Sequence, residues 1–206
     1  MQPTEQKIYL ASKSPRRREL LRQIGVDFEL LLLREQPPRG PDVTELVLPG
    51  EHAIDYVARV TREKAACAQR IVQARKLPAR PILAADTTVV IDDRILGKPA
   101  DLAEAVDMLR ALSGRTHQVL TSIAVSYGKQ SWQVTQSSDV AFAAMTAQTI
   151  DAYCATREPY DKAGGYGIQG PAASFIAHIS GSYTGIMGLP LFETAQLLKQ
   201  AGLRIL

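Results

Sequence analysis

The hydrophobic and polar positions in the first thirty residues predict a strand, a helix and a second strand. The apolar segment Ile8–Ala11 is typical of a short buried strand. Ser14 followed by Pro15 predicts a helix start, with Ser as the N-cap and Pro at the first helical position, and Gly25 predicts its end. Asp27–Leu33 is then expected to be the second strand.

The middle of the chain predicts one long helix, one buried strand and a shorter helix. Apolar positions at three- and four-residue steps predict a helix over Glu51–Arg75. Its inner stripe is expected to contain Ile54, Val57, Thr61, Lys64, Ala68 and Ile71. The apolar run Ile82–Ile91 predicts a buried strand that ends in a turn at Asp92-Asp93. Asp101 is expected to cap a helix that ends at Gly114. The inner face of that helix is expected to contain Leu102, Ala105, Val106, Leu109 and Leu112.

The last third alternates strands and helices around a glycine-rich segment. The predicted elements are strands His117–Ser126 and Trp132–Phe142 with a hairpin at Tyr127–Lys129, a helix from Thr146 through Cys154, an irregular segment Pro159–Pro171, a strand Ser174–Ile179 and a helix Leu191–Ala201. Because strands and helices are interspersed and include a hairpin, we expect an α/β fold with a mixed β-sheet flanked by helices.

Length and composition favour one domain. The chain has 206 residues, 46% of them hydrophobic and 22% charged, which is typical of a single globular domain over residues 1–206. Four prolines and two glycines lie within Arg34–Gly50, and they predict a long loop there.

Charge and cysteine usage narrow the possible partners. The net charge of +3 is too small to predict a nucleic-acid partner. Cys67 and Cys154 form no CxxC motif, so neither a zinc site nor a disulfide framework is expected. Met1–Lys7 is polar, and no apolar run approaches the roughly 18 residues of a membrane span. We therefore expect a cytoplasmic protein with no membrane partner.

Three consecutive arginines occupy the first turn of the first predicted helix. Arg16, Arg17 and Arg18 meet the positive end of the helix dipole there, where cations are unfavourable by a few tenths of a kcal/mol each. A single arginine at this place would be read as a solvated surface charge. Three beside free backbone N–H groups favour a polyphosphate ligand, to which Ser12 and Ser14 can add hydroxyl donors.

Asp86 interrupts the buried strand Ile82–Ile91. A carboxylate in that setting costs several kcal/mol unless it is paired, hydrogen-bonded or metal-bound. A structural Asp at a strand end and a catalytic acid at the strand's C-terminal end explain it about equally. Lys64 projects from the apolar stripe of its helix, and Lys98 stands between Gly97 and Pro99; each is ambiguous alone.

The segment Asp161–Gly170 contains four glycines around Tyr166 and Gln169. Such a loop allows close approach of a ligand to the backbone, and Gln169 can form paired hydrogen bonds with a base edge. It matches neither a Walker loop nor a dinucleotide fingerprint. The alternative is a plain irregular loop.

Together these segments resemble the motif series of the Maf family of nucleotide pyrophosphatases, in order and approximate spacing. The motifs are Ser12–Arg17, Arg62–Ala65, Ala85–Thr87, Gly97–Pro99, Ser113–His117 and Asp161–Gly170. The resemblance implies a two-lobed α/β fold with the active cleft between the lobes. It also implies hydrolysis of a nucleoside triphosphate to monophosphate and pyrophosphate, with Mg²⁺ or Mn²⁺ as cofactor, and it suggests a homodimer.

The resemblance assigns roles residue by residue. Asp86 matches the family's general base, although a metal-ligand role is equally compatible with it, and Lys64 and Lys98 match the phosphate-binding lysines. Arg16, Thr87 and Gln169 match positions typical of the branch that acts on dTTP and UTP. Ser12 and Arg17 are expected to help bind the substrate.

The segment Arg34–Gly50 is longer than the family's pattern. We match the family's acidic residue in this loop to Glu35, as a second metal ligand.

Two alternatives remain at this point. One is a branch of the same family acting on a methylated guanosine triphosphate, against which Arg16, Thr87 and Gln169 argue. The other is a non-catalytic regulator of cell division that binds a nucleotide. Such a regulator would need the basic residues but not Asp86.

Overall fold

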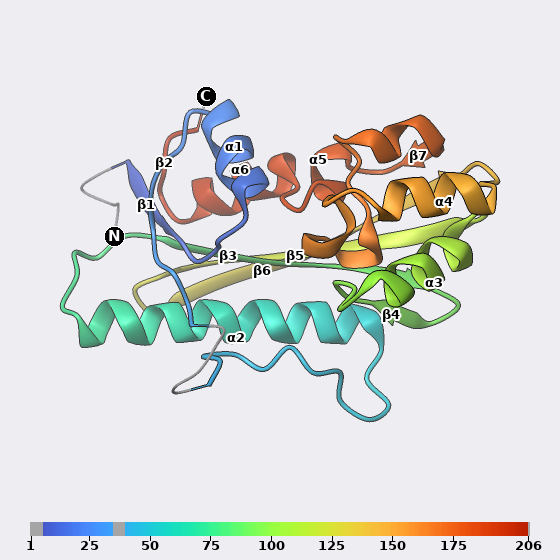
Figure 1. The fold of residues 1–206 in the computed structure, drawn as a ribbon. Helices are drawn as coiled ribbons and strands as arrows, with labels where there is room; N and C mark the ends of the chain where they lie inside the picture. Colours follow the sequence, from blue (N-terminus) through green and yellow to red (C-terminus); the bar gives the residue numbers. More distant parts are fainter. Residues whose placement is uncertain (1–5, 35–39, 206) are drawn as a thin grey trace.

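The computed structural model describes residues 6–34 and 40–205, which form a seven-stranded sheet flanked by helices (Figure 1). The strands are β1 (Lys7–Leu10), β2 (Asp27–Leu30), β3 (Ile82–Ile91), β4 (Arg94–Leu96), β5 (Thr116–Tyr127), β6 (Gln130–Phe142) and β7 (Ile176–Ser180). The α-helices are α1 (Pro15–Gln23), α2 (Ala53–Ala74), α3 (Leu102–Leu112), α4 (Ala147–Cys154), α5 (Tyr183–Ile186) and α6 (Leu191–Gln200). Three 3₁₀ helices, η1 (Pro159–Asp161), η2 (Ala163–Gly165) and η3 (Pro171–Phe175), lie in and beside the glycine-rich segment.

The sheet is mixed, as the sequence predicts. Its order is β2-β1-β3-β5-β6-β7, with β4 paired to β3. β1 runs parallel to both β2 and β3. The pairs β3–β4, β3–β5, β5–β6 and β6–β7 are antiparallel. β5 and β6 form the expected hairpin.

Helices cover both faces of the sheet, and the hydrophobic core is divided accordingly. Figure 1 shows α2 along one face and α1 and α6 on the other side. On the α2 face, Ile82 and Ala84 of β3 pack with Ala65 and Ala68 of α2. On the opposite face two clusters lie at the two ends of β3. Leu83 and Ala85 belong to one with α1 and α6, while Val89 and Ile91 belong to the other with α3 and α4.

The sheet has a gap along one side of β3. β1 pairs with β3 only at Ile82 and Leu83, and β4 pairs with it only from Val89 onward. Residues 84–88 therefore have β5 on one side and no paired strand on the other within the described chain. This gap is where a ligand can approach the middle of the central strand.

Several element boundaries differ from the sequence expectation. The strand expected over Asp27–Leu33 ends at Leu30, because its partner β1 ends at Leu10, which pairs with Leu30. The strand expected over Ser174–Ile179 begins at Ile176, because Pro171 starts a 3₁₀ helix that continues to Phe175. The short elements β4 and α5 were not predicted.

Two residues expected on inner helix faces are exposed instead. Ile54 is 53% exposed and Leu102 is 54% exposed. Each lies in the first turn of its helix, α2 or α3, before the helix reaches the sheet. The rest of the α2 stripe points inward as expected, including the apolar part of Lys64.

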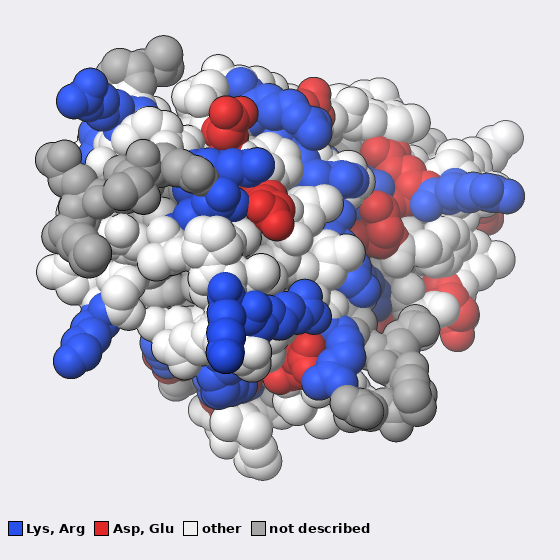
Figure 2. Space-filling model, turned by 90° about the vertical axis from the view of Figure 1, so that its left-hand side faces the viewer, with Lys and Arg blue, Asp and Glu red and all other residues white. Residues whose placement is uncertain are grey.

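Charges of both signs are mixed on the end of the molecule where β1 and β2 lie. On the face seen in Figure 2, Lys and Arg side chains are interspersed with Asp, Glu and uncharged residues. No helix within residues 6–34 and 40–205 has the length and apolar character needed to cross a membrane.

Candidate active site

A cleft of about 750 Å³ opens at the gap beside β3. Its walls come from the β1–α1 connection, β3, the segment after β4, the glycine-rich segment and the loop before α2. It brings together the sequence-predicted site residues Ser12, Arg16, Arg17, Lys64, Asp86, Thr87, Lys98 and Gln169, with the side chain of Lys64 entering from α2. Glu35, predicted as a metal ligand, lies outside the described residues.

Asp86 lies at the base of this cleft, in the middle of β3. It is the fifth of ten residues in the strand, so the expectation of a place at the strand's C-terminal end is wrong. The gap in the sheet exposes the strand from its side, which makes a strand end unnecessary. The residue as a whole is 8% exposed.

Lys64 bridges two carboxylates. Its Nζ lies 2.7 Å from Oδ1 of Asp86 and 2.6 Å from Oε1 of Glu45. Burial by itself lowers the pKa of Lys64, but attraction to Asp86 and Glu45 outweighs it, so the pKa is raised above its ordinary value. The buried cation therefore stays charged and compensates the carboxylates beside it.

Sequence reasoning missed Glu45. Burial alone would raise the pKa of Glu45, but attraction to and hydrogen bonding with Lys64, together with attraction to Lys98, lower it. The residue belongs to the long loop, which Figure 1 shows running alongside α2. The one available signal was an acidic residue in a Pro- and Gly-rich loop, where position gives no indication of what the side chain meets.

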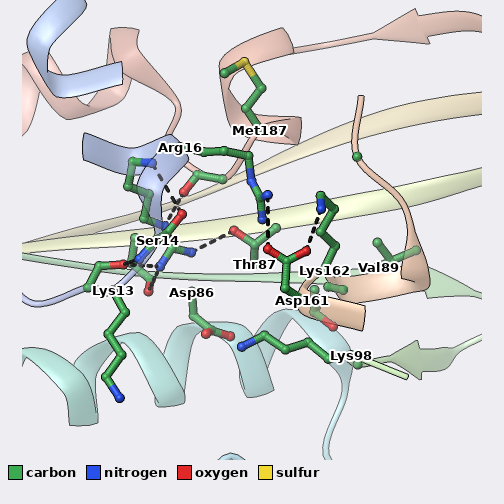
Figure 3. A pocket seen from close by; sticks show the side chains of 18 of the residues that line it. Lys13, Ser14, Arg16, Asp86, Thr87, Val89, Lys98, Asp161, Lys162 and Met187 are labelled. Carbon is green, nitrogen blue, oxygen red and sulfur yellow. Dashed lines mark hydrogen bonds and ion pairs between the residues drawn. The ribbon is translucent and has the colours of Figure 1, made fainter. Parts of the chain in front are cut away.

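Lys98 supplies a second ammonium group from the opposite wall. Its side chain points toward Asp86 in Figure 3 and forms no hydrogen bond or ion pair within the described residues. Both lysines singled out from the sequence therefore flank the same carboxylate, and one of them is available to a ligand.

The start of α1 forms the anion-binding wall that the sequence predicts. Ser14 caps the helix by accepting the backbone N–H of Arg17 at 3.4 Å. Ser12 Oγ accepts the backbone N–H of Ser14 and an N–H of Arg17, both at 3.2 Å. The Ser12 hydroxyl keeps its own proton for donation into the cleft.

The side chain of Arg17 donates most of its hydrogen bonds to other residues of the chain. Its guanidinium donates to Gly188 O at 2.7 Å, Ala85 O at 2.9 Å, Ser12 Oγ at 3.2 Å and Thr87 Oγ1 at 3.1 Å. These contacts use four of the five N–H donors of an arginine. Arg17 thus links α1 to β3 and to the segment after α5, and it leaves one N–H for a ligand.

Arg16 points across the cleft toward the glycine-rich segment. Its Nη1 lies 3.7 Å from Oδ2 of Asp161, and the other oxygen of Asp161, Oδ1, pairs with Lys162 Nζ at 2.5 Å (Figure 3). At 3.7 Å the Arg16–Asp161 pair is long and partly solvated, so the guanidinium is free to turn to a stronger anion.

The glycine-rich segment is fixed from behind by Tyr166. The side chain of Tyr166 is buried, and its hydroxyl lies 2.7 Å from Nε2 of His117. Gly164 has φ +70° and packs on Val89, where a Cβ would come within 2.8 Å of a methyl carbon. Gln169 is exposed at the cleft wall and forms no hydrogen bond within the described residues, so its amide can pair with a ligand.

Comparisons with known proteins place nearly the whole chain in one family. The family described as Maf-like protein matches residues 7–201. A protein of Ralstonia nicotianae named dTTP/UTP pyrophosphatase is 56% identical over 199 residues, covering 96% of this chain and 95% of its own length. A protein of Nitrosospira multiformis with the same name is 53% identical over 201 residues, covering 98% and 97%.

Among solved structures, a HAM1 protein from Coxiella burnetii is 16% identical with a TM-score of 0.48, covering 95% of this chain and 100% of that one. The family match spans nearly the whole described chain, and five of the six quoted motifs contribute residues to one cleft. The sixth motif, Ser113–His117, lies behind the cleft, where His117 contacts Tyr166. This chain belongs to the Maf-like protein family.

Proposed function

We propose that this protein hydrolyses dTTP and UTP to the nucleoside monophosphate and pyrophosphate. The observation that carries the proposal is a central carboxylate, Asp86, flanked by the cations Lys64 and Lys98 in one cleft. The names of the curated relatives, dTTP/UTP pyrophosphatase, support the same activity at about half identity over nearly full length.

In this proposal the polyphosphate lies between the start of α1 and Lys98. Arg16, the Ser12 hydroxyl and the N-terminal end of α1 bind phosphate oxygens, because guanidinium, hydroxyl and helix dipole all favour an anion there. Lys98 binds from the opposite wall. Arg17 acts chiefly by holding Ser12 and Thr87 in place, since most of its donors are used within the protein.

Base recognition is assigned to the wall formed by Gln169. Its amide offers one donor and one acceptor, which suits the alternating carbonyl and N–H groups of uracil and thymine. The match of Arg16, Thr87 and Gln169 to the positions typical of the dTTP/UTP branch supports that branch over methylated guanosine triphosphate. Thr87 lies nearby on β3, with its hydroxyl accepting from Arg17.

The donor set fits a divalent cation, Mg²⁺ or Mn²⁺. No group of three or more His, Cys, Asp or Glu side chains gathers within residues 6–34 and 40–205. Two carboxylates, Asp86 and Glu45, nevertheless converge on Lys64. Mg²⁺ commonly binds through one or two carboxylates plus substrate phosphates, so these two would hold it, and a bound nucleotide would add phosphate oxygens. When bound, the ion supplies charge neutralisation at the phosphate oxygens.

Hydrolysis then needs one water and one proton acceptor. The water oxygen forms a bond to the α-phosphorus, its proton passes to Asp86, and the bond from that phosphorus to the bridging oxygen breaks as pyrophosphate leaves. No covalent intermediate is required. Lys98 and Arg16 stabilise the charge that develops on the leaving group.

We also propose that residues 1–206 form one catalytic domain of a cytoplasmic homodimer. Light scattering on the purified protein tests the dimer.

The activity is tested by pyrophosphate release from dTTP, UTP, ATP, GTP and methylated GTP, with and without Mg²⁺ or Mn²⁺. The expected result is metal-dependent release from dTTP and UTP, absent in Asp86→Asn. Nucleotide binding without release from any of them would favour the non-catalytic regulator instead.

A further inference from the structure

Glu45 belongs to a segment that hydrophobic burial does not hold in place. Residues 40–50 contain no helix or strand, and the three residues after Glu45 are apolar but open to solvent. Leu46 is 71% exposed, Val47 is 47% exposed and Leu48 is 50% exposed. Val43 alone of this stretch packs against the core, beside Tyr56 and Val57 of α2. Something else must fix the carboxylate that meets Lys64.

Arg59 of α2 binds this segment through its main chain and through Glu51. Its guanidinium donates to Leu46 O at 2.9 Å and to both oxygens of Glu51 at 2.6 and 2.9 Å. Glu51 Oε2 in turn accepts the backbone N–H of Leu48 at 3.0 Å. The result is a closed network that holds the backbone on both sides of Val47.

The network is well suited to positioning. An arginine fork bound to both oxygens of a carboxylate fixes direction as well as distance, and the two side chains are only 18% and 9% exposed. Hydrogen bonding to Arg59 lowers the pKa of Glu51 to about 2, so the pair stays charged at neutral pH. Tyr56 adds one more hydrogen bond to this segment, because its hydroxyl donates to Glu45 O at 3.1 Å.

Arg59 is not among the residues that line the cleft. It lies more than one helical turn before Lys64 on α2, so it has no direct route to a substrate phosphate. Any influence of Arg59 on the reaction must therefore pass through the loop that carries Glu45.

We propose that Arg59, together with Glu51, is a positioning residue that holds Glu45 beside Lys64 and Asp86 and so sets the affinity of the site for its divalent cation. The proposal rests on the proposed metal-assisted hydrolysis. It adds a support that lies outside the cleft. Outer partners that orient metal-binding carboxylates commonly change metal affinity or activity by about 10- to 100-fold when removed.

The test uses Arg59→Met, Glu45→Gln and the double variant, with Arg110→Met as control for loss of a surface arginine. Arg110 is exposed on α3, and among the described residues its one ion pair is with Asp107 at 3.9 Å. Two quantities are measured: binding of Mn²⁺ alone by calorimetry, and the Mg²⁺ concentration giving half-maximal dTTP hydrolysis. We expect Arg59→Met to weaken both by about tenfold, with KM for dTTP at saturating metal within about twofold.

The double variant separates positioning from a general effect. If Arg59 acts through Glu45, Arg59→Met adds little to the loss already caused by Glu45→Gln. Full additivity, or Mn²⁺ affinity in Arg59→Met equal to that of Arg110→Met, overturns the proposal.

Arg59→Lys covers the case in which Arg59→Met unfolds, because a lysine can still donate to Glu51 and to Leu46 O but cannot bind both oxygens of Glu51 as a fork. It should restore the thermal midpoint and part of the Mn²⁺ affinity; recovery of the midpoint alone would contradict a positioning role.

Amide hydrogen exchange over residues 43–50 gives a readout that needs no turnover. It is expected to speed up in Arg59→Met, even if the wild-type protein proved inactive on dTTP. Unchanged exchange over residues 43–50 would contradict the role of the Arg59–Glu51 network and would leave the proposed activity untouched.

Discussion

The ammonium group of Lys64 lies 2.7 Å from the carboxylate of Asp86, which ties the long helix α2 to the middle of β3. The same ammonium lies 2.6 Å from Glu45. In the absence of a divalent ion, Lys64 is therefore the nearest cation for two carboxylates. Substitution of Lys64 is therefore expected to lower the thermal midpoint as well as the rate of hydrolysis.

Lys64→Met is expected to lower the thermal midpoint at low metal concentration. Breaking a largely buried ion pair leaves the remaining charge uncompensated, here at a cost of about 2 kcal/mol, or roughly 4–8 °C for a chain of this size. Because Mn²⁺ can replace the lost cation, it should raise the midpoint of Lys64→Met more than that of the wild type. Calorimetric scans with and without Mn²⁺ check this. An equal Mn²⁺ response in both proteins would contradict it.

Asp86→Asn is expected to reduce turnover by about two to four orders of magnitude while nucleotide affinity largely survives. Arg16 and Lys98 remain to bind phosphate, and Lys64 keeps its pair with Glu45. The thermal midpoint should therefore change little. Pyrophosphate release, nucleotide binding and midpoint are measured on the same variant. Near-normal release with a large drop in midpoint would make Asp86 structural.

The neighbouring arginines Arg16 and Arg17 should behave differently. Arg16→Ala removes a long, partly exposed pair worth less than about 1 kcal/mol, so it should impair dTTP turnover and leave stability intact. Arg17→Ala removes four internal hydrogen bonds and leaves the buried carbonyls of Ala85 and Gly188 without this partner. It should lose about 2–3 kcal/mol of stability. Parallel melting and kinetics on both variants decide, and equal melting losses would refute the distinction.

Selectivity is expected to depend on Gln169. The wild type should cleave dTTP and UTP with much higher kcat/KM than ATP or GTP, and Gln169→Ala should flatten this preference, because a polar group that pairs with one base edge rejects the wrong edge. Tyr166→Phe serves as the control and should keep the preference, since the Tyr166 hydroxyl lies against His117. Equal wild-type rates on purine and pyrimidine triphosphates would defeat the assignment.

Stability should depend on pH through His117. Burial lowers the pKa of His117 to about 4, whereas an unfolded chain has a histidine pKa of about 6.5. Between these values the unfolded state binds a proton on His117 and the folded state does not. The contribution of neutral His117 to the free energy of unfolding is therefore complete above about pH 6.5 and is lost as the pH falls toward 4. The thermal midpoint should fall across this window in the wild type and less in His117→Gln. Identical pH profiles would show that other groups dominate.

Much of the fold follows from local pattern. The strand Ile82–Ile91, the caps Ser14 and Asp101 and the helix that opens at Thr146 were predicted correctly, because each depends on residues adjacent in sequence. The short strand β4 was missed, although the turn at Asp92-Asp93 was predicted: three residues carry too little periodicity. β2 was predicted too long, since its length is set by its partner rather than by its own composition.

The site divides in the same way. Asp86, Lys64 and the arginine cluster were found because each breaks a rule that stable structure alone would follow. Glu45 breaks no such rule, since an acidic residue in a polar loop is ordinary, and its role depends on a contact across nineteen positions to Lys64. The inward role of Arg17 was likewise hidden, because its partners Ala85 and Gly188 are distant in sequence and offer only backbone oxygens.

The interruption of the sheet beside β3 bears on how such a protein can diversify. β5 pairs with β3 from Ile82 to Val90, so the backbone that carries Asp86 is fixed along its closed side. The walls of the cleft come from separate connections that can accept insertions without disturbing that pairing. Changes in a rim segment such as the glycine-rich segment that carries Gln169 can therefore leave the position of the Asp86 carboxylate unchanged. Because of the gap beside β3, the residues that select the base can change without moving the strand that carries Asp86.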